Sequence, residues 1–284
     1  MTVSPLPPLT LLYVPADRPD RVTKAFGTAA DVVLVDLEDA VAPTHKDEAR
    51  SNAVRLLADA SDARQAQVRV NHSSTPWHGD DIAALATLPT TVGARIPKVE
   101  SPEEIHALAT ALPGRALHPL IESALGVERA LEIATASPQI GSLGLGEADL
   151  RSDLRVADDA GLTWARSRII VAARAARLPP PAMSAYPNVR DHEGLATSCR
   201  AGRALGFHGR AAIHPAQLAT IRAAFLPTAP EIERAREVMA RLESAITSGV
   251  GAIALADGTF LDVAMVEQAR AVLALADSTP TLSS

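Results

Sequence analysis

The chain has 284 residues, of which 47% are hydrophobic and 21% are charged, and its formal net charge is −6. This composition is typical of globular proteins, and the negative balance argues against nucleic acid or an anionic membrane as a partner. Aromatic residues amount to 3%, which excludes a surface that stacks bases on aromatic rings and predicts an aliphatic core.

Short runs of β-branched and aliphatic residues alternate with longer Ala-rich helical patterns. We predict eight strands, at residues 9–14, 32–36, 67–71, 93–96, 116–121, 140–145, 181–184 and 210–213. Repeated strand–helix units predict a parallel sheet, and eight of them favour a closed (β/α)₈ TIM barrel. An open doubly wound sheet is the main alternative. The first strand–helix turn, residues 15–19, argues against it because it lacks a Gly-rich phosphate loop.

Helical patterns lie between the strands, at residues 103–112, 126–136, 165–176 and 195–205. After the last strand come two further helices, at 215–225 and 230–249, a short segment at 251–262 and a final helix at 264–276. The barrel is complete before this tail. We therefore divide the chain into a TIM barrel, residues 1–225, and a C-terminal helical extension, residues 226–284, which we expect to form a lid over its own barrel or a neighbour's.

Charged residues follow nearly every predicted strand. Catalytic groups of α/β barrels lie at these strand ends, whereas solvated charges belong on the outer helices. In chain order they are Arg18, Asp36, Glu38, Asp39, Arg69, Lys98, Glu122, Glu147, Asp149 and Asp191, together with the polar residues Asn71 and His214.

Glu122 and Asp149 follow what should be adjacent strands. Two carboxylates, completed by waters and a substrate carboxylate, are the ligand set expected for Mg²⁺. The alternative is that each side chain stabilises the N-terminus of the following helix. Because the two occur as a pair at neighbouring strand ends, we predict a magnesium site.

Arg69 lies inside a predicted strand, and a buried arginine is costly unless it is paired. It forms either an ion pair with a barrel carboxylate or a clamp on a substrate carboxylate or carbonyl oxygen. Asp36, Glu38 and Asp39 lie close together in one loop, at the end of the predicted strand 32–36. Alternation along a strand sends neighbours to opposite faces, so we expect that they do not all face the pocket alike. Glu38 or Asp39 would act on a substrate hydroxyl or orient a metal-bound water.

Several motifs carry a resemblance to a known family. They are YVPADRPDR at 13–21, VDLEDAV at 35–41, VRVN at 68–71, IPKVES at 96–101, IESA at 121–124, GEADL at 146–150, DHEGL at 191–195 and IHPAQ at 213–217. In this order they resemble the citrate lyase beta subunit family, part of the HpcH/HpaI aldolase/citrate lyase group on the pyruvate-kinase-like barrel. The resemblance spans essentially the whole chain.

The resemblance implies a Mg²⁺-dependent carbon–carbon lyase that cleaves or forms a 3-hydroxy-acyl thioester. The thioester would be citryl, citramalyl or malyl, carried on CoA or an acyl carrier protein, and the products a keto acid (oxaloacetate, pyruvate or glyoxylate) and an acyl thioester. In the family, the positions matching Glu122 and Asp149 bind Mg²⁺, and the position matching Arg69 contacts the keto acid. The positions of Arg18, Arg21 and Lys98 are candidates for binding the anionic carrier.

The resemblance also implies that an aspartate of the C-terminal segment reaches the active site, often from a neighbouring subunit of a homotrimer or hexamer. Asp262 is the candidate. The chain departs from the family beside it, with Phe260-Leu261 in place of a Met–Ile pair and Ala264 in place of a proline. The alternative is that Asp262 caps the last helix. Either Asp262 or Glu38 would move the proton of the substrate hydroxyl.

Two rival functions remain open. A Mg²⁺ enzyme of enolpyruvate phosphate would need more phosphate-binding cations near the metal than the sequence shows. A non-catalytic or partner-dependent beta subunit of a citrate lyase complex is the second. No stretch reaches the roughly 20 apolar residues of a membrane helix, and no signal peptide is recognisable, so we expect a cytoplasmic protein.

Overall fold

The computed structural model describes residues 6–59, 65–248 and 261–277. Internal contacts divide the chain into two compact units. The first runs from Pro7 to Phe225, and the second comprises the chain from Leu226 onward together with Leu6.

The first unit is built on a parallel sheet whose strands are linked by helices. The strands are β1 (Thr10–Pro15), β2 (Val32–Asp36), β3 (Gln65–Arg69), β4 (Gly93–Ile96), β5 (Leu117–Ile121), β6 (Gly144–Leu145) and β7 (Arg210–Ala212). They are ordered β6-β5-β4-β3-β2-β1-β7, and every neighbouring pair is parallel. The sheet is curled, because residues of all seven strands line one cavity.

The eighth predicted strand, residues 181–184, is reduced to a single parallel bridge between Met183 and Arg210 of β7. The Met183 N–H donates to the Gly209 carbonyl and the Met183 carbonyl accepts from the Ala211 N–H, both at 2.9 Å. Three prolines, at 179–181, precede this bridge. Proline has no backbone N–H, so a longer ladder has few donors here.

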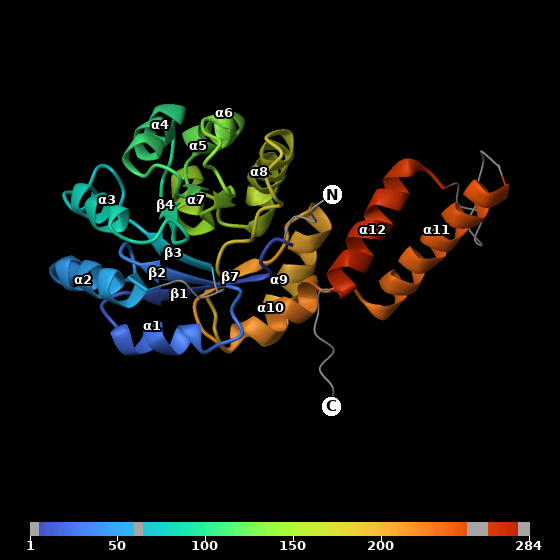
Figure 1. The fold of residues 1–284 in the computed structure, drawn as a ribbon, viewed down its shortest axis with the longest axis horizontal. Coiled ribbons are helices and arrows are strands. Elements are labelled where there is room, and N and C mark those ends of the chain that lie inside the picture. Colours follow the sequence, from blue (N-terminus) through green and yellow to red (C-terminus); the bar gives the residue numbers. More distant parts are fainter. Residues whose placement is uncertain (1–5, 60–64, 249–260, 278–284) are drawn as a thin grey trace. The chain divides into compact units, whose positions relative to one another are not determined.

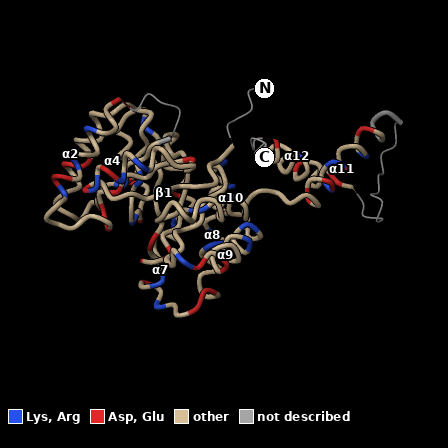
Figure 2. The backbone as a smooth tube through the Cα atoms, turned by 90° about the horizontal axis from the view of Figure 1, so that it is seen from below, with Lys and Arg blue, Asp and Glu red and all other residues tan. Residues whose placement is uncertain are grey.

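Helices lie outside the strands that they connect (Figure 1). They are α1 (Pro19–Phe26), α2 (Lys46–Leu57), α3 (His78–Ala86), α4 (Pro102–Ala111), α5 (Ala124–Glu128), α6 (Ala130–Thr135), α7 (Glu147–Leu154), α8 (Thr163–Ala175), α9 (His192–Leu205) and α10 (Gln217–Phe225). Proline begins α1 and α4, where its fixed φ suits the first turn and its missing N–H costs nothing. Both signs of charge are spread over outer helices such as α2 and α4 (Figure 2).

The predicted helix at 126–136 is two helices, α5 and α6, that meet at Arg129. The backbone of Arg129 leaves the helical region there, with φ −90° and ψ 9°. The other predicted helices of this unit, at 103–112, 165–176, 195–205 and 215–225, occur close to their predicted positions as α4, α8, α9 and α10.

In the second unit, α11 (Ala229–Ser248) and α12 (Val263–Asp277) lie side by side (Figures 1 and 2). Their contact buries an aliphatic cluster of Ala235, Val238, Leu261, Val266 and Ala269. Most of the predicted segment at 251–262 lies outside the described residues. In the part of the chain that the structure describes, no helix is long and apolar enough to span a bilayer.

Candidate active site

A cavity of about 370 Å³ opens at the carboxyl ends of the strands in the first unit. Six of the charged residues predicted at strand ends or beside them line it: Asp36, Asp39, Arg69, Glu122, Glu147 and Asp149. Asp36 and Arg69 are the last residues of β2 and β3, and Glu122 directly follows β5. The structure therefore brings this group of residues together around one cavity.

Glu122 is the most deeply placed carboxylate of the predicted metal pair, with 7% of its surface exposed. The backbone N–H of Lys98 donates to its Oε2 at 2.8 Å. Its Oε1 lies against Gly146, where no side chain would fit, and accepts no hydrogen bond from a described residue. Burial raises the pKa of Glu122 to about 7, and the charges of Glu38 and Asp149 act in the same direction, whereas Lys98 opposes the rise.

Asp149 lies in the first turn of α7, and Glu38 follows β2. The Lys98 ammonium joins the two, with Nζ 2.9 Å from Asp149 Oδ2 and 2.8 Å from Glu38 Oε1. The same nitrogen is 4.0 Å from Glu122 Oε2. Burial opposes the charge of Lys98, but hydrogen bonds to Glu38 and Asp149 raise its pKa. A cation therefore already lies among these carboxylates.

The donor set fits Mg²⁺. Mg²⁺ usually binds proteins through one or two carboxylates and completes its octahedron with water and substrate oxygens. Glu122 and Asp149 supply two carboxylates on one cavity, and Glu122 Oε1 is unengaged by the described residues. No group of three or more His, Cys, Asp or Glu ligands occurs among the described residues, as a structural Zn²⁺ site or a protein-caged Ca²⁺ site would require.

Arg69 forms the ion pair that the sequence left as one of two interpretations. Its Nε and Nη2 donate to the two carboxylate oxygens of Asp36 at 2.7 and 2.6 Å. Its Nη1 is 2.8 Å from Glu38 Oε2 and 3.3 Å from Asp39 Oδ2, and the guanidinium lies over the ring of Tyr13. Burial disfavours the charge, but these carboxylates raise the pKa of Arg69.

Asp36, Glu38 and Asp39 all reach the Arg69 guanidinium, but only Asp36 and Asp39 line the cavity, so the three do not face the pocket alike, as expected. The alternation of β2 ends at Asp36, whose carboxylate accepts the N–H groups of Glu38 and Ala40 and turns the chain back. Burial also raises the pKa of Glu38, against the opposing effects of Arg69 and Lys98.

The remaining predicted residues lie elsewhere. Arg18 and Arg21 are exposed at the start of α1, and Arg18 Nε is 3.7 Å from Asp20 Oδ1. Neither forms an ion pair with a carboxylate of the cavity among the described residues. Asp262 belongs to the second unit, where its Oδ1 accepts the Met265 N–H at 2.8 Å. It therefore caps α12, as in the alternative interpretation.

Sequence reasoning missed two polar groups of this cavity, Tyr13 and Arg95, whereas Glu147 was among the residues predicted at strand ends. Tyr13 and Arg95 line it from β1 and β4. Glu147 lines it from α7 and forms a buried pair with Arg166 of α8, with contacts of 2.8 and 2.6 Å. The available signal for Arg95 was a single arginine within an otherwise apolar buried strand, the same signal that drew attention to Arg69.

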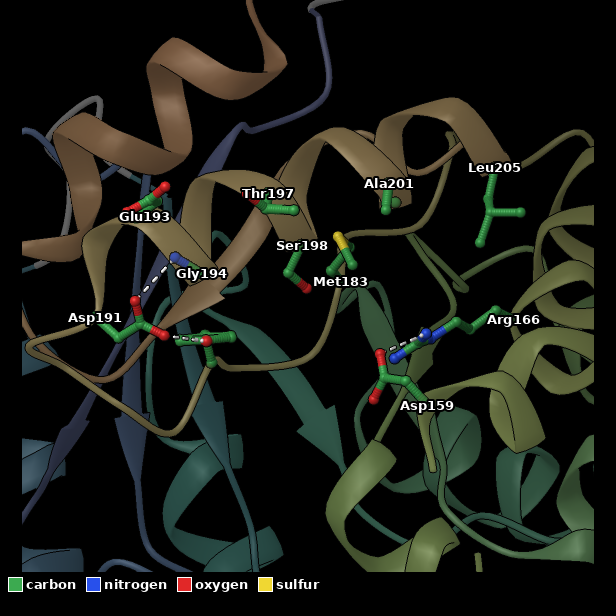
Figure 3. A pocket seen from close by; sticks show the side chains of 12 residues that line it. Asp159, Arg166, Met183, Asp191, Glu193, Gly194, Thr197, Ser198, Ala201 and Leu205 are labelled. Carbon is green, nitrogen blue, oxygen red and sulfur yellow. Dashed lines mark hydrogen bonds and ion pairs between the residues drawn. The ribbon is translucent and has the colours of Figure 1, made fainter. Parts of the chain in front are cut away.

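A second hollow, of about 670 Å³, lies beside α9 (Figure 3). Asp159, Arg166 and Asp191 line this hollow, and each already has a hydrogen-bond partner. Asp159 contacts Arg166 at 3.0 Å, and Asp191 accepts the Gly194 N–H at 2.9 Å and the Tyr186 hydroxyl at 2.6 Å. None of the predicted catalytic residues lines this hollow.

Comparison with known proteins matches the chain to one group of enzymes. The family model described as HpcH/HpaI aldolase/citrate lyase matches residues 9–215. A (3S)-malyl-CoA thioesterase of Cereibacter sphaeroides is 36% identical over 273 residues, covering 95% of this chain and 94% of that protein. The citrate lyase subunit beta of Leuconostoc mesenteroides subsp. cremoris is 33% identical over 284 residues, covering 95% and 93%.

Among solved structures, the CitE protein of Mycobacterium tuberculosis in complex with magnesium, acetoacetate and coenzyme A matches with a TM-score of 0.82. It is 32% identical in sequence, and the match covers 95% of this chain and 98% of that chain. Both compact units of the chain therefore have counterparts in known proteins.

Proposed function

Because the chain belongs to the HpcH/HpaI aldolase/citrate lyase family, we propose that it is a Mg²⁺-dependent carbon–carbon lyase of 3-hydroxy-acyl-CoA thioesters. The substrate would be a citryl, citramalyl or malyl thioester, and the products a keto acid and an acyl-CoA. The observation that carries the proposal is the pair Glu122 and Asp149 on one cavity, with the Arg69 guanidinium on the same wall.

Glu122 and Asp149 would hold the metal. When bound, Mg²⁺ supplies positive charge that polarises the oxygen of the forming keto acid. Metal binding would displace the Lys98 ammonium from Asp149, and Lys98 would keep its contact with Glu38. Lys98 is then free to contact the anionic thioester, and the exposed Arg18 and Arg21 would bind its phosphates farther out.

The protein's own groups move the proton and stabilise charge. A carboxylate, Glu38 or Asp262, takes the proton of the substrate hydroxyl, the adjacent C–C bond breaks, and the electron pair passes to the thioester α-carbon, which then takes up a proton to give the acyl-CoA. Glu38 suits this role because burial has already raised its pKa. Arg69 Nη1 adds positive charge where negative charge develops, and Asp39 holds that nitrogen in place.

We propose further that residues 181–184 complete a (β/α)₈ barrel of the pyruvate-kinase type, and that residues 226–284 form a lid. In a homotrimer or hexamer this lid would carry Asp262 to a neighbour's cavity. The match to the CitE structure over both units supports this arrangement.

Hydrolysis of the same thioester is a second candidate, because a relative at 36% identity is a (3S)-malyl-CoA thioesterase. Water would then attack the thioester carbonyl and the CoA thiolate would leave, with the C–C bond intact. The same carboxylates and metal would serve both reactions, so the products decide between them.

The test is to incubate the purified chain and Mg²⁺ with citryl-CoA, malyl-CoA and citramalyl-CoA, and to identify the products. A lyase releases keto acid and acyl-CoA, whereas a thioesterase releases the hydroxy acid and free CoA thiol. We expect keto acid, lost in Glu122→Gln and on chelation of the metal. No keto acid from any substrate, with wild type indistinguishable from Glu122→Gln, would refute the lyase. Activity that appears only after other citrate lyase subunits are added would establish the partner-dependent alternative.

A further inference from the structure

A second arginine lies inside the cavity, and the mechanism above does not use it. Arg95 is the third residue of β4 and pairs in register with Arg69 of β3. It lines the cavity, although only 6% of its surface is exposed. Placing a guanidinium here costs solvation free energy, which some interaction has to offset.

The described residues offset that cost only in part. Gln67 Oε1 accepts from Arg95 Nε and Nη2 at 3.1 and 2.7 Å, but this amide carries no charge. No carboxylate of the described residues lies within ion-pair distance of Arg95, and no acceptor among them contacts Nη1. By contrast, the buried guanidinium of Arg166 has a carboxylate on two of its nitrogens. Arg95 is thus a buried cation with a donor left over for a ligand.

The unused donor lies near the chain segment, residues 144–146, against which Glu122 also packs. Arg95 Nη1 is 3.2 Å from the position that a Cβ atom would occupy at Gly144. Glu122 Oε1 lies against the position that a Cβ atom would occupy at Gly146. These glycines are two residues apart, so they face the same side and are separated by about 7 Å along the chain. A glycine at each position is what allows both polar groups to approach the backbone so closely.

Tyr13 adds a second donor at the same depth. Its side chain lines the cavity, and its hydroxyl makes no hydrogen bond to a described residue. Burial raises its pKa, so the phenol keeps its proton and donates rather than neutralising the arginine. The surrounding floor is apolar, with Leu11, Leu34 and Leu120. An anion reaching this floor would meet two free donors and little competing water.

We infer that Arg95, with Tyr13, binds the second carboxylate of a dicarboxylic 2-oxo acid whose first carboxylate lies at the Glu122–Asp149 end of the cavity. The site therefore selects a four-carbon diacid such as oxaloacetate over a monocarboxylic keto acid of equal length. This inference rests on the proposed function and names the keto-acid class of that same site.

The test compares two keto acids that differ only in the terminal group. Binding of freshly prepared oxaloacetate and of 2-oxobutyrate, which carries a methyl group in place of the second carboxylate, is measured by titration calorimetry with Mg²⁺ present. We expect oxaloacetate to bind about ten- to a hundredfold more tightly, as is usual for a buried charge-assisted hydrogen bond. In Arg95→Met this ratio falls to near one through weaker binding of oxaloacetate alone. In Arg95→Lys, which keeps the charge, part of the ratio survives.

Arg210→Met is the matched control, because Arg210 is also a buried strand arginine without a carboxylate partner among the described residues, and it does not line the cavity. It should keep the wild-type ratio. A wild-type ratio near one, or an unchanged ratio in a folded Arg95→Met, would overturn the inference and leave the lyase standing. If neither keto acid bound the wild type with Mg²⁺ present, the proposed function would fail as well. Should Arg95→Met not fold, the wild-type and Arg95→Lys ratios decide.

Discussion

Glu122, a proposed metal ligand, shows what burial does to a single carboxylate. Its carboxyl lies between a backbone N–H donor and a glycine, with two other acidic side chains near it. Burial makes its charge unfavourable until a cation arrives. The same depth that destabilises the free carboxylate keeps bulk water from competing for a bound ion.

The pKa of Glu122 predicts how stability and metal binding depend on pH. Its pKa in the folded chain is about 7, above the usual 4.5, so the metal-free fold retains a proton that the unfolded chain loses. Metal-free stability should therefore fall as pH rises from about 4.5 to about 7, by about 3 kcal/mol, and then level off. Mg²⁺ affinity should rise over the same window, with about one proton released on binding at pH 6. Chemical denaturation and calorimetry check both, and Glu122→Gln should remove both dependences.

Lys98 is expected to hold the pKa of Glu122 down, because its positive charge opposes the effect of burial. Lys98→Met should raise that pKa further and move the pH midpoint of Mg²⁺ binding upward. Residue 98 has a backbone φ of 53°, which is unfavourable for lysine and methionine alike. Backbone strain is therefore the same in the wild type and in Lys98→Met. A midpoint that stays in place or moves down would contradict the charge arrangement described here.

At the scale of elements, the turn from β6 into α7 positions the metal pair. Gly146 ends the strand, the Glu122 carboxyl packs against its Cα, and Asp149 follows in the first helical turn. A side chain at 146 would occupy the space of that carboxyl. The close approach of two elements is therefore part of the site.

Gly146→Ala should weaken Mg²⁺ binding by at least about tenfold, because the Glu122 carboxyl has to move. Calorimetric titration of Mg²⁺ measures the loss. Gly79→Ala in α3 is the matched control, since nothing lies within 4 Å of the added carbon, and it should bind Mg²⁺ like the wild type. Equal affinity in both variants would show that Glu122 does not need its present position.

The elements also show what the sequence could predict. β2 and β4 have the predicted bounds. A short apolar run flanked by polar turns can be recognised as a strand from the neighbouring residues alone. The predicted strand at 140–145 shortens to Gly144–Leu145 plus a bridge at Ile140, and 181–184 to one bridge, because pairing depends on neighbours distant in sequence. Arg69 was recognised with two possible roles, but its pairing with Asp36 depends on register, which no local pattern contains. Arg95 went unnoticed although a lone arginine in an otherwise apolar strand was a local signal, the same one that drew attention to Arg69.

At the scale of the whole molecule, the chain has a unit that holds the cavity and a helical unit that holds Asp262. Within its own unit Asp262 caps α12. Our proposal gives it a catalytic role in a neighbour's cavity, so the activity of mixed oligomers is informative.

Asp262→Asn and Glu122→Gln chains should each be inactive. Mixing and co-refolding them should restore about a quarter of wild-type activity, because one cavity in four would combine an intact Glu122 with an intact Asp262 from its neighbour. Steady-state assay of the mixture checks this. No recovery, with exchange of subunits confirmed by mass, would place both residues in one chain's site or leave Asp262 as a helix cap.

The central claim is that Glu122 and Asp149 together hold the catalytic Mg²⁺. A crystal structure of the chain grown with Mg²⁺ and oxaloacetate tests it most directly. We predict one octahedral ion about 2.1 Å from one oxygen of each carboxylate, with Lys98 moved away from Asp149 and keto-acid oxygens among the remaining ligands. An ion bound elsewhere, or Lys98 still bridging Asp149 and Glu38 with the keto acid bound and no metal between the pair, would contradict the account.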